Sequence, residues 1–428
     1  MHIQCTNRTA IVDTLDHLPP IPLLLDYRCS IGETITKQDE SGIYRALPLR
    51  DRLRQIILYL PPSILHKCLV YMDGCFPMLE YLSLWSVGDR ITAVTLPKAF
   101  LAPNLRHLEM PGIGRPPKRL RLLTSTASLR TLMLWNIETS GYFRPRLLAA
   151  RLSCLPQLKV LVIGFSMPIP RPSTEMEMLG EQGTPVMLPN LNHLKFRGVS
   201  AYLESLVTQI TTPLLKQLDV MLYNQIAFAL PHLSHFINIT ETLKLPTVKI
   251  FFGQYEVFIV TFDHHSIGPF RLCVLCTQLD WQIHCAAQIC SALIPRLSGV
   301  ERIVLDFYDE ILPTEWQNSE IESTTWHELL RPFIGVKELH IEDGLLNEVS
   351  CALQVDEVES DPGFLPNLQQ IFAERNLFAS FIDIRQVMDI PVQFMGPTST
   401  TFPKLQRNKG PRLLEPKEPE NPLGESKV

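Results

Sequence analysis

Leu79-Glu-Tyr-Leu82-Ser-Leu84 is the stretch that decides the fold, because its pattern, L-x-x-L-x-L, returns along the chain in close variants. In L-x-L the two apolar residues point to one side of a short strand, and the residue between them points to the other side. One side of each strand therefore belongs to the core. The copies begin at Leu53, Leu79, Leu105, Leu129, Leu158, Leu191 and Leu215 and, after a gap, at Val300, Val336 and, more weakly, Leu368.

The spacing of these copies is typical of a repeat. From Leu53 to Leu215 the intervals are 26, 26, 24, 29, 33 and 24 residues, and all but one fall within the period of about 20 to 29 residues of leucine-rich repeats. One unit cannot bury its apolar side alone, so the strands must stack in parallel. The sequence predicts an α/β fold, a leucine-rich-repeat-like solenoid with a curved parallel sheet and with helices and irregular returns on the convex side.

A strand at each copy has to be weighed against an amphipathic helix, in which L-x-x-L-x-L also occurs. Four prolines stand two residues before the first leucine of a copy, which favours a repeated start of a strand. The intervening segments 63–72 and 201–210 carry apolar residues at helical spacing and are predicted as helices on the return path. The four prolines are Pro77, Pro103, Pro156 and Pro189.

The repeat is interrupted between Leu215 and Val300. Segments 248–252, 257–262 and 272–275 are rich in β-branched and aromatic residues, which predicts an irregular, hairpin-containing section around 245–280, followed by a helix over 281–294. Residues 167–186 are interpreted as a loop insertion. We divide the chain into an N-terminal segment, 1–48, the solenoid, 49–394, and a polar, Pro-rich tail, 395–428, expected to be disordered.

The amino-acid composition limits the kinds of partner and the cellular compartment that we expect. The 428 residues are 46% hydrophobic with a formal net charge of −5, which gives no electrostatic reason to expect nucleic acid or an anionic membrane as partner. We find no signal peptide and no apolar run long enough to cross a bilayer. The ten cysteines are mostly far apart, as in a reduced protein. We expect a cytoplasmic or nuclear protein without a cofactor.

Several polar clusters were considered as sites and given a simpler interpretation. Cys273 and Cys276, with His284 downstream, resemble zinc ligands, but on a strand the two cysteines would point to opposite faces. A metal-dependent activity there stays the weakest hypothesis. The pair His264 and His265 is interpreted as a polar loop. The basic run 115–121 is either a solvated loop or a contact for import factors or an acidic partner. No catalytic motif occurs, so we expect no enzyme.

The predicted binding surface consists of the outward residues of the strands, which a solenoid presents as one concave face. Trp85 and Trp135 matter most, since exposed Trp and Arg dominate binding hot spots, unless both indoles fold back over the edge of the repeat. The candidate residues for binding a partner are Tyr81, Trp85, His107, Glu109, Met133, Trp135, His193, Lys195, Arg197 and Asp219; flanking ones are Ser83, Thr131, Gln217, Arg302, Asp306, Glu338, His340 and Glu342.

From Leu18 to Ile384 the chain resembles an expanded family of basidiomycete fungal F-box and leucine-rich-repeat proteins. The strings that carry the resemblance are Leu18-Pro-Pro-Ile-Pro-Leu-Leu-Leu-Asp-Tyr27, Leu49-Arg-Asp-Arg-Leu-Arg54, Leu96-Pro-Lys-Ala-Phe-Leu-Ala-Pro-Asn-Leu-Arg-His-Leu108, Leu179-Gly-Glu-Gln-Gly-Thr-Pro185, Phe196-Arg-Gly-Val-Ser-Ala-Tyr-Leu-Glu204 and Thr325-Trp-His-Glu-Leu-Leu330. The resemblance implies substrate recognition, in which an F-box docks on the Skp-type linker of a cullin ubiquitin ligase and the repeats hold an unidentified protein target.

The start of the chain departs from that family. An F-box opens with a Leu-Pro-x-Glu-like phrase, whereas Leu18-Pro19-Pro20 is followed by Pro22 and by no acidic residue at the Glu position. We therefore recognise no F-box in residues 1–48. Two functions remain open, a ubiquitin-ligase substrate adaptor and a stand-alone repeat scaffold or decoy with no ligase connection.

Overall fold

The repeated phrase forms the strands of one large sheet. The computed structural model describes residues 3–6, 21–29, 35–87, 94–111, 123, 125–138, 143–166, 184–223, 230–243, 245–263, 266–276, 279–307, 323–354, 365–374 and 392–395. Within these ranges the chain is α/β, and 16 strands share a mostly parallel sheet. Their order is β1-β2-β3-β4-β5-β6-β7-β9-β11-β14-β13-β12-β15-β16-β17-β18, while β8 and β10 form a separate pair.

The strands are short and follow the predicted phrases. Each strand of the regular part starts two residues after the first apolar residue of its copy. The exception is β3, which includes that residue. The bounds are β1 Ile3–Thr6, β2 Leu23–Arg28, β3 Leu53–Leu60, β4 Tyr81–Ser86, β5 His107–Pro111, β6 Thr131–Ile137, β7 Val160–Phe165, β8 Val186–Met187, β9 His193–Gly198, β10 Ile210–Thr211, β11 Gln217–Leu222, β12 Thr247–Phe252, β13 Glu256–Asp263, β14 Ser266–Leu275, β15 Arg302–Phe307, β16 Glu338–Glu342, β17 Gln370–Glu374 and β18 Val392–Met395.

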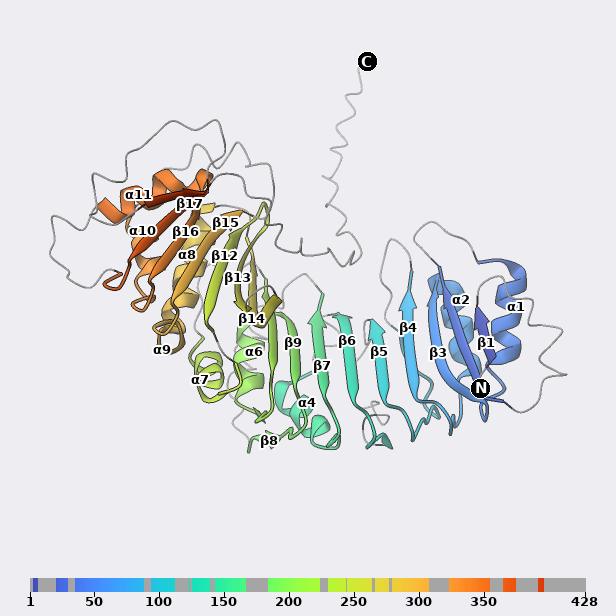
Figure 1. Cartoon of the computed structure of the whole chain (residues 1–428). Helices are drawn as coiled ribbons and strands as arrows, with labels where there is room; N and C mark the ends of the chain where they lie inside the picture. Colours follow the sequence, from blue (N-terminus) through green and yellow to red (C-terminus); the bar gives the residue numbers. More distant parts are fainter. Residues whose placement is uncertain are drawn as a thin grey trace, which may run out of the picture.

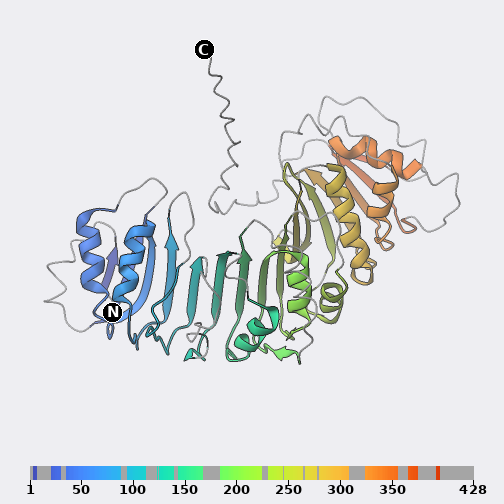
Figure 2. The same ribbon diagram turned by 180° about the vertical axis from the view of Figure 1, so that it is seen from behind.

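Helices lie on one face of the sheet. In Figure 1 they stand behind the strands, and in Figure 2, seen from the other side, they stand in front. The helices predicted over 63–72, 201–210 and 281–294 are present as α2, α6 and α8. The bounds are α1 Lys37–Ala46, α2 Pro62–Tyr71, α4 Pro145–Leu152, α6 Ser200–Val207, α7 Pro231–Ile239, α8 Leu279–Ala292, α9 Ile294–Leu297, α10 Ser323–Leu330 and α11 Leu346–Gln354, with a short 3-10 helix over Asp343–Leu345.

The same tight turn prepares most strands. The N–H of the first apolar residue of a copy donates to the carbonyl three residues earlier, at 3.2 Å in Leu79 and at 3.0 Å in Val300. The residue that supplies the carbonyl is buried in each case, as Phe76 and Leu297 illustrate. Proline occupies the second position of the turn at Pro77 and at three further predicted places, because its fixed φ suits that position and its missing N–H is not needed there. This turn recurs before β4, β5, β6, β7, β9, β11, β15, β16 and β17.

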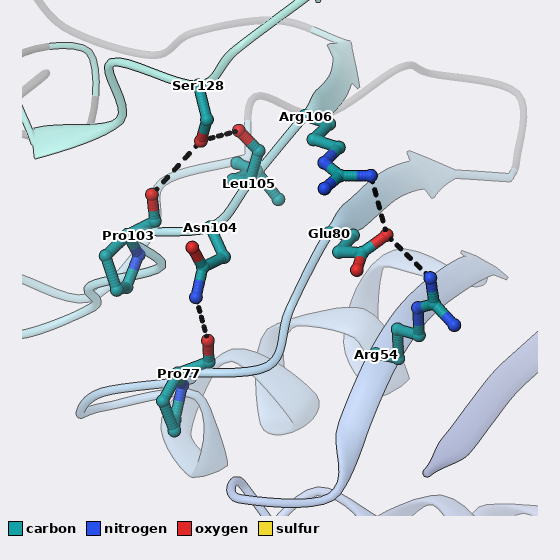
Figure 3. A network of polar contacts seen from close by, with 8 residues as sticks. All are labelled: Arg54, Pro77, Glu80, Pro103, Asn104, Leu105, Arg106 and Ser128. Carbon is teal, nitrogen blue, oxygen red and sulfur yellow. Dashed lines mark hydrogen bonds and ion pairs between the residues drawn. The ribbon is translucent and has the colours of Figure 1, made fainter.

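Side chains at the turns also tie each unit to the one before it. Figure 3 shows the Asn104 Nδ2 donating to the Pro77 carbonyl at 2.8 Å, and the Ser128 hydroxyl reaching the Pro103 and Leu105 carbonyls. Asn190 and Asn367, which stand at the equivalent place, each bond a carbonyl of their preceding unit at 2.8 Å. These bonds satisfy turn carbonyls that the sheet does not reach.

The core lies between the sheet and the helices. The register places corresponding leucines side by side across the strands, as with Leu82, Leu108 and Leu132, and these side chains are fully buried. They belong to one continuous cluster with helix residues such as Leu65 and Leu206. Since strand side chains alternate, the residues between the leucines point to the opposite face. That face, on which the described residues place no helix in Figures 1 and 2, is called the open face below.

Two features of the sheet were not predicted from the repeat alone. The sheet begins before the first phrase, because β1 and β2, both within residues 1–48, pair in parallel with each other, and β2 pairs in parallel with β3. The interrupted section extends the sheet as three antiparallel strands, and β14 rather than β12 pairs with β11, so that the chain order is reversed there. The segments 115–121 and 167–183, the His264 and His265 pair and the tail from 396 lie outside the described residues.

Candidate functional site

Most of the predicted binding residues lie in two rows across the open face. Register partners form the first row at Tyr81, His107 and Thr131, and the second row at Ser83, Glu109 and Met133. Row members are about 4.8 Å apart along the hydrogen-bonding direction of the sheet. The predicted residues of later strands continue these rows, with His193 and Gln217 in the first and Lys195 and Asp219 in the second. The candidate residues of β4 to β11 that were predicted from the sequence pattern therefore lie on one surface.

The first part of this surface is an aromatic cluster centred on a carboxylate. The Tyr81 ring and the His107 imidazole are stacked with centroids 4.0 Å apart, and the Tyr59 ring meets the Trp85 indole edge-on at 6.0 Å. The Ser83 hydroxyl donates to Glu109 Oε2 at 2.8 Å, and His107 Nε2 lies 3.9 Å from the same oxygen. The sequence prediction omitted Tyr59, whose strand does not keep a strictly alternating pattern.

The electrostatics of this cluster favour an ionised carboxylate. Burial tends to raise the pKa of Glu109, but the nearby His107 imidazole, the hydrogen bond from Ser83 and the neighbouring Trp85 outweigh burial and lower it below the ordinary value. At the edge of the cluster Arg28 lies over the Tyr59 ring at 5.4 Å and pairs with Asp26 at 2.8 Å. The aromatic side chains of β3 to β5 are therefore fixed by neighbours of both charges.

The second part of the surface lies over β6 to β11. The Trp135 indole lies against Gly164, where an added Cβ would come within 3.2 Å of its Cε3. The Lys195 ammonium lies 5.5 Å from the centre of the Trp135 ring and pairs with Asp219 at 3.1 Å. Trp85 and Trp135 are both half-buried, so each leaves part of its surface to solvent.

The remaining predicted residues fall on the same face. Met133 is half-buried between the register partners Glu109 and Val162. Burial lowers the pKa of His193, against the opposing effect of Asp219. The Arg197 guanidinium lies over the Tyr223 ring at 5.5 Å.

Beyond the reversed strands the rows resume. Arg302 pairs with Glu338 at 2.6 Å, and Glu338 lies 3.5 Å from His340 Nε2. Asp306 pairs with Lys249, which also lies over the Phe251 ring at 4.2 Å. Lys249 was not among the residues predicted from the sequence, because β12 was not assigned to the repeat. The predicted charged residues of β15 and β16 thus form ion pairs across strands.

An apolar cluster separates the two charged parts of the open face. Phe251, Phe258, Val260 and Cys273 are buried together there, apart from the main core. The Arg271 guanidinium lies over Phe258 at 4.6 Å. No pattern in the sequence predicted this cluster, because its strands are apolar on both faces and show no alternation of apolar and polar residues.

The suspected zinc residues do not converge. Cys273 belongs to the apolar cluster of the open face and Cys276 to the main core, so the predicted opposite orientation is confirmed. Cys276 instead shares a hydrogen bond with Cys285, which with burial raises the pKa of Cys276 well above its usual value. His284 Nε2 lies 2.6 Å from the Gln288 amide nitrogen. Within the described ranges no three His, Cys, Asp or Glu side chains gather as a metal site requires.

Comparison with known proteins adds no relative to this picture. Of the helices in the described part of the chain, none is both long and apolar enough to cross a membrane. No protein-family model matches the sequence, and no curated protein matches it.

Proposed function

We propose that this chain is a leucine-rich-repeat-like solenoid that binds another protein through its open face, without catalytic activity of its own, in the cytoplasm or nucleus. The repeated turn and the side-by-side register of the leucines support the solenoid, because each unit is closed in the same way and contacts the next. In solenoids of this kind the strand face without helices is the concave binding surface.

The observation that carries the binding proposal is the composition of the open face. Aromatic and charged side chains follow one another in register over β3 to β11, including Tyr59, Trp85 and Trp135. Half-buried tryptophan and tyrosine provide large contact areas at a low cost in side-chain entropy, and Trp, Tyr and Arg are the residue types enriched in binding hot spots.

The repeats would then serve as the target-holding half of an F-box ubiquitin-ligase adaptor, as the resemblance of residues 18–384 implies. In that role a Skp-type linker and a cullin are further partners, and the open face holds the protein to be modified. No part of this role requires chemistry in the chain itself, since the ligase supplies it.

One observation favours the alternative, a stand-alone scaffold or decoy with no ligase connection. Two stretches of the N-terminal segment, β1 and β2, belong to the sheet, since Leu23, Leu25 and Tyr27 of β2 are buried in the main core together with Cys5 of β1. An F-box is a set of short helices ahead of the repeats, whereas β1 and β2 are strands of the sheet.

Affinity capture tests the binding surface. A Trp85→Ala, Trp135→Ala double variant should capture a partner at least tenfold less efficiently than the wild type, since each indole contributes about 1 kcal/mol or more at an interface. Trp281→Ala is the control, because Trp281 is exposed on α8, on the helical side of the sheet. Equal capture by all three proteins would contradict the assignment of the open face.

Co-purification with a Skp-type linker separates the two functions. An adaptor should retain the linker under conditions in which an F-box protein retains it. Capture of a target without the linker would support the stand-alone scaffold.

A further inference from the structure

A row of cations borders the open face where strands β5 to β7 begin. Arg106, Arg130 and Lys159 occupy the second position of three successive phrases, directly before those strands. The Arg130 N–H donates to the Arg106 carbonyl at 2.8 Å, and the Lys159 N–H to the Arg130 carbonyl at 2.7 Å. The three residues are thus direct neighbours on adjacent strands, about 4.8 Å apart, and we call them the basic rim.

At two other places in this position, residues of opposite charge pair across neighbouring strands. Glu80 stands between Arg54 at 3.1 Å and Arg106 at 3.5 Å, as Figure 3 shows. Lys337 pairs with Glu301 at 2.8 Å in the same way. Alternation of this kind offsets the repulsion that like charges on neighbouring strands would exert.

The basic rim breaks this alternation. All three side chains are exposed, and among the described residues neither Arg130 nor Lys159 forms an ion pair. The rim is short, because Glu80 precedes Arg106 and the neutral Asn192 follows Lys159 in the ladder. Since Arg106 shares Glu80 with Arg54, the three cations together form a local surplus of positive charge.

The sequence that contains the rim is also rich in cations. Residues 98–166 hold 11 Lys and Arg and 2 Asp and Glu, although the whole chain has 39 Lys and Arg and 44 Asp and Glu. A negatively charged ligand would be attracted to this sector alone. A long polyanion such as a nucleic acid would have to continue over the acidic remainder, which favours a short ligand.

The floor next to the rim is apolar. Along β6 and β7 the open face carries Met133, Trp135, Val160 and Val162 beside the single polar Thr131, and the Trp135 indole lies against Gly164. From the rim to Trp135 the distance is about five strand residues, or roughly 16 Å. A ligand that crosses this sector therefore meets cations first and an apolar floor after them.

We propose that the basic rim and this floor bind a short acidic peptide segment of a partner protein, one in which a run of Asp or Glu precedes an apolar side chain. The inference rests on the proposed protein-binding function and names the chemistry of the partner. The acidic run neutralises the rim, and the apolar side chain packs on Met133 and Trp135.

Fluorescence anisotropy tests the proposal on the full chain. The probe is a fluorescein-labelled peptide in which a run of Glu precedes Leu and Phe, and its control has Gln in place of every Glu. The wild type should bind the Glu peptide at least tenfold more tightly than the Gln peptide, with an affinity that falls as salt is added. Equal affinity for both peptides, or no binding of either, would overturn the proposal.

A charge reversal at the centre of the rim gives the sharpest variant. Arg130→Glu should weaken binding of the Glu peptide about tenfold, whereas Lys337→Glu, the same charge change in the same row outside the sector, should leave it unchanged. Arg130→Glu also restores the alternation of charge, so its melting temperature should equal or exceed that of the wild type. Unfolding is thereby excluded as the cause of lost binding.

Two further outcomes distinguish this inference from its alternatives. A single-stranded RNA oligonucleotide that binds more tightly than the Glu peptide and is released by Arg130→Glu would assign the rim to nucleic acid and overturn the peptide proposal. Capture of a partner that persists in Arg130→Glu but is lost in the Trp85→Ala, Trp135→Ala variant would overturn the rim while leaving the protein-binding function intact.

Discussion

Gly335 lies against the Ser298 carbonyl of the preceding unit so closely that a Cβ on Gly335 would come within 2.3 Å of that oxygen. Gly299 stands at the equivalent place one unit earlier, directly before the first residue of its phrase, yet nothing lies within 4 Å of its ideal Cβ. Two glycines at the same repeat position therefore meet opposite surroundings, one crowded by backbone and one open to solvent.

This contrast predicts opposite effects of one substitution. Gly335→Ala should lower the free energy of unfolding by about 2 kcal/mol, because the added methyl group forces the two units apart. Gly299→Ala should leave stability unchanged or raise it by up to about 1 kcal/mol, through the reduced entropy of the unfolded chain. Urea unfolding measures both. Equal effects of the two substitutions would mean that the units are not stacked as described.

Glu204 links two successive helices. Its carboxylate, at a buried position in α6, accepts hydrogen bonds from the backbone N–H groups of His232 and Leu233 at 2.8 Å each. These groups belong to the first turn of α7, whose preceding residue Leu230 provides no side-chain cap. Glu204 thus satisfies N–H groups that a helix start leaves without partners.

We expect Glu204→Ala to lower the free energy of unfolding by about 2 kcal/mol, because two backbone N–H groups, of which that of Leu233 is buried, lose their acceptor. Glu204→Gln should cost less, since its amide oxygen can still accept a hydrogen bond. Glu241→Ala, an exposed change in the following turn, is the control. Burial raises the pKa of Glu204, so its contribution to stability is present at low pH and declines as pH rises through the folded-state pKa.

The regular strands could be predicted because two independent signals agree there. The leucines repeat at a fixed spacing, and a proline such as Pro103 marks the turn before the strand. The candidate residues of β4 to β11 followed from this, since alternation alone places Tyr81 or Lys195 opposite the leucines. Their partners were not predictable, because contacts such as that between Ser83 and Glu109 depend on the register of neighbouring strands.

The reversed section shows where sequence patterns stop being informative. Strands β12 to β14 are apolar on both faces, as Phe251 and Phe252 illustrate, so no alternation indicates which strand joins β11. The basic rim was missed for a different reason. Its residues Arg106, Arg130 and Lys159 lie 24 and 29 residues apart, and only the sheet makes them neighbours, whereas the contiguous run 115–121 is visible in the sequence.

Glu109 predicts a pH dependence of stability. Its pKa is lower in the folded protein than the ordinary value of a Glu carboxyl, so its contribution to stability is present above the unfolded-state pKa and is lost as pH falls through the folded-state pKa. Between about pH 6 and pH 3 the wild type should therefore lose more stability than Glu109→Gln. Glu80→Gln, at a half-buried position outside this cluster, serves as the control and should resemble the wild type. A Glu109→Gln protein with an unchanged pH profile would contradict the assigned network.

The reactivity of the cysteine thiols tests which side chains are buried in the folded protein. Of the cysteines other than Cys351 in the described residues, Cys75 and Cys154 are exposed, and the others are buried. Burial also raises the pKa of Cys5 to about 11 and that of Cys68 to about 12. Since the thiolate is the reactive form, buried thiols of this kind react slowly.

A thiol reagent such as DTNB should therefore label the native protein in two phases. In a Cys351→Ser background, which removes the cysteine whose side chain is not described, Cys75 and Cys154 should react rapidly and the remaining thiols only on unfolding. Adding Cys75→Ser and Cys154→Ser should abolish the rapid phase. A rapid phase that persists would show that a thiol of the core, such as Cys5 in β1 or Cys290 in α8, is open to solvent. The packing of the helices on the sheet would then need revision.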